Sequence, residues 1–165
     1  MSAVQSAFPP GAERRVGGRT VFVCTVGDRE YWLAQTGVGL EKAGRSAAQL
    51  LDNQSFSLMV STGFACALIT TKVGALLAGR DVVRAVGRGV DVCQAIEVPG
   101  AERDMVMALV EGANPAGHIG RFVSTDYIVG SASEKRRFSH SIGAIGLDME
   151  SAALAAEAQR AQVPF

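Results

Sequence analysis

The chain has 165 residues, of which 48% are hydrophobic and 19% are charged, and its 16 basic and 16 acidic side chains give a formal net charge of zero. This length and apolar content predict a single domain over residues 1–165 and exclude extended disorder, which needs low hydrophobicity and high charge. Zero net charge argues against a nucleic-acid partner, because such binders rely on attraction to phosphates.

The composition also bears on location and on metal binding. No window approaches 18 consecutive apolar residues, and residues 1–18 lack the basic-then-apolar layout of a signal peptide, so no membrane span is expected. With two histidines and no CxxC or HExxH pairing, we expect no metal site. The three cysteines lie singly in apolar stretches, as reduced buried thiols do, which predicts a cytoplasmic protein: Cys24, Cys66 and Cys93.

The first third of the chain predicts a hairpin and a helix after an irregular lead-in. Residues 1–18 are rich in glycine and proline and carry few bulky apolar groups, so they read as that lead-in. Val21–Val26 and Tyr31–Thr36 have the β-branched and aromatic content of two hairpin strands. After the Gly37–Gly39 turn, apolar residues recur every three or four positions over Leu40–Leu51, which predicts a helix.

The middle of the chain predicts three strands and one helix. Composition and turn signals indicate strands over Ser57–Ser61, Gly74–Val86, with a bulge or bend at Gly79 and Arg80, and His118–Ser124, and a helix over Glu102–Gly112. Between the first two strands, the small residues of Thr62–Ala67 would let a backbone approach a ligand closely.

The last third predicts a capped helix, a strand and a final helix. Ser131–Glu134 matches a capping box, in which a serine hydroxyl and a glutamate carboxylate satisfy each other's backbone N–H groups, and the helix would run through Phe138. A strand over Ala144–Met149 and a helix over Glu150–Gln162 follow. This alternation predicts an α/β fold with a mixed, largely parallel sheet and helices on both faces.

Ligands on such folds bind beyond the carboxyl ends of the strands. The segments at those ends are Gly37–Gly39, Thr62–Ala67, Thr125–Gly130 and Asp148–Glu150. None of them carries a dinucleotide fingerprint or a phosphate-binding P-loop, and no nucleophile and base pair is visible. On the residues alone the chain is an α/β small-molecule binder.

Two of these segments contain side chains suited to a nucleoside. Glu150 has acceptors for the two donors of a vicinal diol, although a carboxylate near a helix start is also favoured by the helix dipole. Tyr127 could stack on a planar base. It could equally be a partly buried residue of the core with no role in binding.

At these same loops the chain resembles the nucleoside phosphorylase/nucleosidase family, which includes purine nucleoside phosphorylases and methylthioadenosine/S-adenosylhomocysteine nucleosidases. The most specific block is the last, where Met-Glu precedes a small-residue helix that ends in Val-Pro-Phe. Its Asp-Met-Glu-Ser also resembles the branch that cleaves adenosylhopane. The four matching blocks are Gln35–Asp52, Ser61–Val82, Val123–Phe138 and Ala144–Phe165.

The resemblance implies a three-layer α/β fold and cleavage of an N-glycosidic bond through an oxocarbenium-like sugar, with water or phosphate as nucleophile and no other cofactor. It implies that Glu150 holds ribose hydroxyls, Met149 packs on the sugar, and Tyr127 stacks on the base beside the backbone of Ile128. The sugar and nucleophile site would be lined by Gly63, Phe64, Ala65 and Cys66.

The resemblance also identifies departures. The family's first strand and the strand with its catalytic aspartate have no counterpart here, so no catalytic residue is assigned and activity would be weak or lost, since general acid help contributes about 10²–10⁴-fold. Phe64 and Ser61 stand where relatives have a serine and a phosphate-binding arginine.

Two further interpretations stay open. One is a non-catalytic nucleoside-binding or interaction domain derived from this family, and the other is an incomplete gene product. In each case sheet edges left uncovered would favour a homo-oligomer, most simply a dimer.

Overall fold

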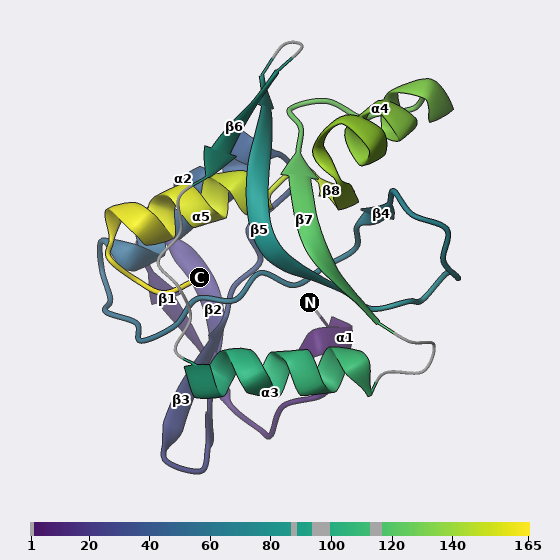
Figure 1. Ribbon diagram of the computed structural model, residues 1–165. Helices are drawn as coiled ribbons and strands as arrows, with labels where there is room; N and C mark the ends of the chain where they lie inside the picture. The colour runs from purple at the N-terminus through teal and green to yellow at the C-terminus, as the bar shows by residue number, and fades with distance from the viewer. Residues whose placement is uncertain (1, 87–88, 94–99, 113–116) are drawn as a thin grey trace.

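The protein is described by a computed structural model over residues 2–86, 89–93, 100–112 and 117–165, and within these ranges its strands form two separate sheets (Figure 1). The smaller sheet is antiparallel, in the order β1-β2-β3, and consists of β1 (Ala12–Val16), β2 (Arg19–Val26) and β3 (Arg29–Leu33). The larger sheet has the order β4-β8-β7-β5-β6 and consists of β4 (Cys66–Ala67), β5 (Leu77–Val86), β6 (Gly89–Cys93), β7 (His118–Ser124) and β8 (Ala144–Asp148).

The helices surround the larger sheet. In Figure 1, α2 and α5 lie behind β5 and β6, α4 lies beside β8, and α3 crosses the lower part of the view. Their bounds are α1 (Ser2–Gln5), α2 (Leu40–Leu51), α3 (Gly100–Glu111), α4 (Ala132–Ile142) and α5 (Ser151–Arg160). This confirms the predicted α/β class with a mixed sheet.

The central strands of the larger sheet are parallel and its edges are antiparallel. β7 pairs in parallel with both β5 and β8, whereas β4 and β6 run antiparallel to their neighbours. Two of the four pairings are therefore parallel, fewer than the sequence predicted. The predicted irregularity of β5 is confirmed as a register shift between Gly79 and Asp81. Ser124 and Asp148 are paired at the carboxyl ends of β7 and β8, which places the following loops side by side.

Two apolar clusters hold these layers together. Phe138 of α4 packs on the sheet with Val83, Val123 and Leu147, all buried. Ala43 and Ala47 of α2 pack against Leu154 of α5 in the second cluster. Small residues at this second contact let the two helices approach closely, and their amino-terminal ends meet at the same edge of the molecule.

The predicted irregular lead-in over residues 1–18 is wrong for much of its length. Residues 12–16 form β1, which reverses into β2 through Gly17 and Gly18, with φ of 57° and 80°. A two-residue hairpin turn of the type favoured by strand twist requires positive φ at both central positions, and glycine supplies this without steric cost. The double glycine was therefore a hairpin signal.

The predicted strand over Ser57–Ser61 is also wrong, because this segment is an irregular connection. Its backbone is tied to the rest of the chain by a bond from the N–H of Met59 to the carbonyl of Pro164 at 2.9 Å, and the Met59 side chain packs on the α2–α5 cluster. Met59 thus serves packing and not sheet pairing, while Val60 is largely exposed. The neighbouring strand is Cys66–Ala67, which pairs with β8.

The remaining predicted elements are present with shifted bounds, whereas α1 and β6 were not predicted. The hairpin strands Val21–Val26 and Tyr31–Thr36 correspond to β2 and β3, and the helix expected to end at Phe138 continues to Ile142. Of the capping box, the bond from the backbone N–H of Glu134 to Ser131 Oγ is present at 3.2 Å, while the Glu134 carboxylate turns to another partner. Among the described residues no helix is long and apolar enough to cross a membrane.

Candidate functional site

The four loop segments singled out in the sequence meet at the carboxyl ends of β7 and β8. Cys66 is paired with Leu147, which brings the small-residue run Thr62–Ala67 to the end of β8. The backbone N–H of Thr125 donates to the carbonyl of Asp148 at 3.0 Å, and the N–H of Gly39 donates to Glu150. Hydrogen bonds and strand pairing thus join segments from four parts of the chain around one edge of the sheet.

Glu150 lies half-buried at the start of α5, where its carboxylate is fixed by main-chain donors. Oε1 accepts from the N–H of Gly39 at 2.7 Å, and Oε2 accepts from the N–H of Met149 at 3.1 Å. A carboxylate has about four lone-pair sites, so two donors orient it and leave acceptors on both oxygens. Those acceptors are what the two hydroxyls of a ribose diol require.

Gly39 can reach Glu150 because of its backbone conformation. It precedes α2 with φ of 97° and ψ of 154°, in a region that is essentially restricted to glycine. The glycine turn therefore has a physical role here, since it aims an N–H group at the start of α5 instead of forming a standard phosphate loop.

Asp148 is occupied by hydrogen bonds within the protein. Its carboxylate accepts from the hydroxyls of Ser124 and Ser151 and from the backbone N–H groups of Glu150, at 3.3 Å, and Ser151, at 3.4 Å. Ser124 Oγ in turn accepts from the N–H of Ala152 at 3.0 Å. This network ties the ends of β7 and β8 to the first turn of α5, so Asp148 supports the carboxylate of Glu150 rather than facing a ligand.

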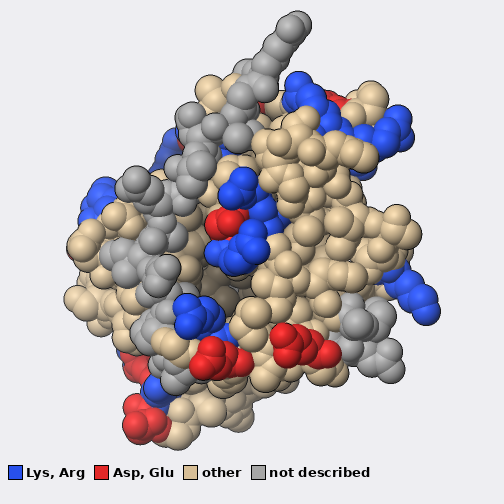
Figure 2. Space-filling view, viewed as in Figure 1, with Lys and Arg blue, Asp and Glu red and all other residues tan. Residues whose placement is uncertain are grey.

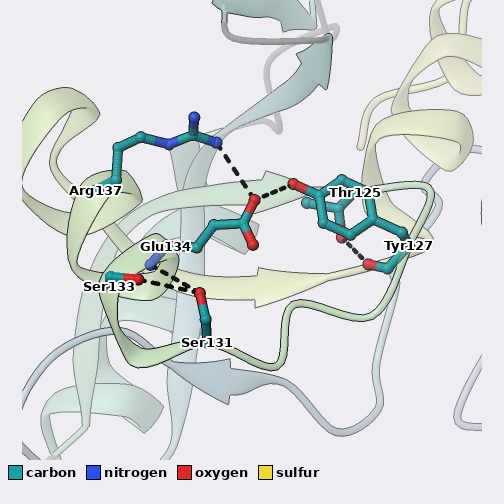
Figure 3. A network of polar contacts seen from close by, with 6 residues as sticks. All are labelled: Thr125, Tyr127, Ser131, Ser133, Glu134 and Arg137. Carbon is teal, nitrogen blue, oxygen red and sulfur yellow. Dashed lines mark hydrogen bonds and ion pairs between the residues drawn. The ribbon is translucent and has the colours of Figure 1, made fainter.

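Tyr127 lies in the loop after β7 and is 41% exposed, and hydrogen bonds hold both its backbone carbonyl and its hydroxyl (Figure 3). Its carbonyl accepts from Thr125 Oγ1 at 2.7 Å, and its hydroxyl donates to the Glu134 carboxylate, which Arg137 also contacts at 3.5 Å. The hydrogen bond to Glu134, aided by burial, raises the pKa of the Tyr127 phenol above its ordinary value. The ring is thereby held in one orientation with part of its surface open.

The other predicted site residues differ in accessibility. Phe64 and Ile128 project into solvent, at 105% and 85% exposed, and a Cβ added at Gly63 would meet no atom within 4 Å. Met149 and Cys66 are half-buried, and Cys66 Sγ donates to the carbonyl of Ala67 at 3.6 Å. The small-residue run Gly63, Phe64, Ala65 and Cys66 is thus an open wall beside the strand ends, not a closed pocket.

Sequence reasoning missed the residues that support this arrangement. Ser124 and Thr125 are fully buried polar residues, and Glu134 fixes Tyr127. A Ser-Thr pair at the end of an apolar strand was a usable signal, because buried hydroxyls need partners. The described residues contain no group of three potential metal ligands.

Comparison with known proteins gives the following relations. A sequence profile of the phosphorylase superfamily matches residues 5–165. The 5'-methylthioadenosine/S-adenosylhomocysteine nucleosidase of Staphylococcus aureus (strain MRSA252) is 27% identical over 150 residues, covering 84% of this chain and 66% of the relative. The chain thus spans about two thirds of the length of this curated relative.

Solved structures share the fold. A mutant of the Helicobacter pylori nucleosidase with 5'-methylthioadenosine in its active site superposes with a TM-score of 0.84 at 17% identity, over 99% of this chain and 76% of that one. The Streptococcus pneumoniae nucleosidase with a transition-state inhibitor gives 0.82 at 18% identity, with 99% and 76% covered. A mutant futalosine hydrolase from Helicobacter pylori gives 0.78 at 16% identity, with 98% and 79% covered.

Proposed function

Because this chain belongs to the phosphorylase superfamily, we propose that it acts on a purine nucleoside or a related adenosyl compound and cleaves the N-glycosidic bond. The observation that carries this proposal is the Glu150 carboxylate, oriented by the N–H groups of Gly39 and Met149 with acceptors left for a ribose diol. The nucleosidase relative from Staphylococcus aureus, whose name specifies adenosyl substrates, supports the choice of substrate class.

In this proposal the nucleoside lies across the ends of β7 and β8. Glu150 accepts from the ribose hydroxyls and Met149 packs on the sugar, while the Tyr127 ring stacks on the base beside the backbone of Ile128. The run Gly63, Phe64, Ala65 and Cys66 lines the side from which the nucleophile approaches. The support for this placement is that the four loops bearing these residues are joined at one sheet edge.

The chemistry follows from the charge that develops on the sugar. As the bond between the anomeric carbon and the base nitrogen breaks, its electron pair leaves with the base and positive charge accumulates on the ring. The negative Glu150 carboxylate beside the hydroxyls stabilises that charge. Water, or hydrogen phosphate as co-substrate, then forms the new bond to the anomeric carbon and releases a proton, which balances the proton that the base nitrogen takes up.

The proposal includes the state of the protein. We expect a single domain over residues 1–165 that assembles as a homodimer in the cytoplasm. The exposed apolar side chains of Phe64 and Val73, at 105% and 106%, and the edge strands β4 and β6 support assembly. The free thiols of Cys24 and Cys66 support a reducing compartment. Sedimentation as a stable monomer at micromolar concentration would exclude the dimer, and cell fractionation tests the location.

The activity is tested by incubating the purified protein with methylthioadenosine, S-adenosylhomocysteine, adenosine and inosine, with and without phosphate, and following free base by chromatography. Release that depends on phosphate identifies a phosphorylase, and release without phosphate identifies a hydrolase. Absence of release from every substrate contradicts the proposal of bond cleavage. In that case calorimetric binding of methylthioadenosine, lost in Glu150→Ala, would identify a nucleoside-binding domain.

A further inference from the structure

A second polar site lies on the side of α4 that faces the loop after β4. The two elements enclose an open groove of about 500 Å³, lined by Ala67, Leu68, Ile69, Thr70, Lys135, Arg136, Ser139 and His140. Figure 2 shows Lys and Arg side chains gathered over α4, at the upper right of this face of the molecule. The lining contains two cationic side chains and no carboxylate.

The polar residues of α4 divide into two sets. Ser131, Ser133, Glu134 and Arg137 are occupied with one another and with Tyr127 (Figure 3). The groove residues Lys135 and Ser139, and likewise Arg136 and His140, are four positions apart, so they share a different face of the helix. Within the described part of the chain, none of these four side chains has a hydrogen bond or an ion pair, nor has Thr70 across the groove.

Both walls of the groove are anchored, so its shape does not depend on a ligand. On the helix side, Phe138 is 3% exposed and packs into the core together with Leu68 from the loop. On the loop side, the N–H of Leu68 donates to the carbonyl of Ile145 at 2.8 Å, and Thr71 Oγ1 lies 3.0 Å from His118 Nε2. The loop is thus fixed just before and just after the groove-lining residues Ile69 and Thr70.

The geometry points to a binding site for a phosphate group in this groove, carried either by inorganic phosphate or by a small phosphorylated metabolite. Lys135 and Arg136 both line the groove, and the lining contains no carboxylate that could pair with either cation. The ammonium, guanidinium and hydroxyl groups of the lining are all hydrogen-bond donors, and a phosphate offers them more acceptor oxygens and more negative charge than a carboxylate does. The groove volume also falls in the range of small-molecule sites.

This groove adjoins the nucleoside site proposed above but uses different side chains. Its cations come from the middle of α4, and none of its lining residues is among those assigned to the nucleoside, although Ala67 directly follows Cys66 in β4. It therefore makes a prediction that does not require base release. A phosphate used as co-substrate would contact the run Gly63–Cys66, and a phosphate in the groove would contact Ile69, Thr70 and α4.

The test is an NMR titration of the isotope-labelled full chain with inorganic phosphate. We expect saturable shifts in the backbone amide signals of Ile69, Thr70 and residues 135–140. In the double variant Lys135→Gln/Arg136→Gln the affinity should fall about tenfold or more, since two charge-assisted contacts are lost. The control Arg15→Gln/Arg103→Gln removes the same charge from β1 and α3 and should bind as the unmodified chain does.

Two outcomes overturn the site. One is the absence of saturable shifts in the groove, including the case in which shifts are confined to Gly63–Cys66. The other is an equal loss of affinity in both double variants, which would indicate a general charge effect. Parallel titrations with ribose 5-phosphate and ribose distinguish a phosphorylated metabolite from free phosphate. Tighter binding of ribose 5-phosphate than of inorganic phosphate identifies a metabolite site. Equal binding of these two compounds identifies a site for free phosphate. The single variants Lys135→Gln and Arg136→Gln serve if the double variant does not fold.

Discussion

The backbone N–H of Gly39 donates to Oε1 of Glu150 across 2.7 Å, and this bond joins the N-cap residue of α2 to the N-cap residue of α5. Hydrogen bonds to an ionised carboxylate are stronger than those between neutral groups. The orientation of the one carboxylate assigned to the ribose therefore depends on a glycine in a different loop. Predictions about either residue test this coupling.

Replacing Gly39 by alanine should disturb both the stability and the site. With φ of 97° the position strains any side chain, although an added Cβ would meet no atom within 4 Å, so the cost comes from the backbone. We expect the free energy of unfolding to fall by about 1–3 kcal/mol and the affinity for methylthioadenosine to fall with it. Denaturant titration and calorimetry measure these, and Gly100→Ala, which is also uncrowded but lacks positive φ, is the control.

Glu150→Gln should weaken nucleoside binding while preserving side-chain shape. The amide has a single oxygen, so one of the two N–H groups, from Gly39 or Met149, would face an NH₂ donor. We expect affinity for methylthioadenosine to fall about tenfold or more and the unfolding free energy to fall by about 1–3 kcal/mol. Glu41→Gln, an exposed change near the start of α2, should leave affinity unchanged. Equal affinity of Glu150→Gln and Glu41→Gln for methylthioadenosine would show that Glu150 does not bind the nucleoside.

The phenol of Tyr127 should titrate at a higher pH than an ordinary tyrosine. Its pKa is raised mainly by the hydrogen bond to Glu134, so the stabilisation is present below the unfolded pKa of about 10 and is lost as pH rises through the folded value. Tyrosinate absorbance in a Tyr31→Phe background reports Tyr127 alone, because the chain has two tyrosines. Adding Glu134→Gln should return the midpoint toward the ordinary value. An unshifted midpoint before that change would contradict the contact.

The ion pair between Asp81 and Arg121 should make stability depend on pH at the acidic end. Arg121 Nε donates to Asp81 Oδ1 at 2.6 Å, and this bond lowers the pKa of the carboxyl. The stabilisation is then present above the unfolded pKa of about 4 and is lost as pH falls through the lowered value. Asp81→Asn should cost about 1 kcal/mol or less at pH 7, because both side chains are partly exposed, and nothing at strongly acid pH. A difference that persists in acid would refute this assignment.

Gly146→Ala should destabilise the larger sheet by overpacking. An added Cβ would lie 2.6 Å from Phe122 Cζ, closer than atoms approach, and Phe122 is only 8% exposed. We expect a loss of about 1–3 kcal/mol in unfolding free energy. Gly79→Ala, whose Cβ would lie 3.5 Å from the same ring, should cost less. Phe122→Leu should recover part of the loss when combined with Gly146→Ala, which a double-mutant cycle measures.

The sequence predicted elements whose signals are local. The three- and four-residue spacing of Leu40–Leu51 is a property of α2 itself, and Ser131 caps α4 through a donor only three residues away. The prediction for Ser57–Ser61 was wrong because a short apolar run can be either a strand or an irregular segment that packs on the core. Composition cannot distinguish the two. The turn at Gly17 and Gly18 did carry a local hairpin signal, which was outweighed by the polar character of the flanking residues.

The candidate site was predictable in its members and not in their partners. Glu150 stood out because a carboxylate follows a strand and precedes a helix. Its donor Gly39 is 111 positions away, and nothing in either local pattern pairs them. Glu134 illustrates the same limit. Its carboxylate was expected to accept from a backbone N–H at the start of α4, but in the structure it accepts from the Tyr127 hydroxyl, a tertiary contact that the local pattern does not indicate.

The two sheets differ in how far apart their partners lie along the chain. β1, β2 and β3 are consecutive, whereas β4 and β8 are brought together across a long stretch of intervening chain. Closing a long loop costs conformational entropy before the contacts between distant strands form. The three-stranded sheet, whose strands are consecutive, can therefore form while the larger sheet is still incomplete. The last strand of the three-stranded sheet, β3, ends at Leu33, shortly before the Gly37–Gly39 turn. We therefore expect Gly39 to be positioned early in folding and the Gly39–Glu150 contact to be completed only when β8 and α5 pack against it.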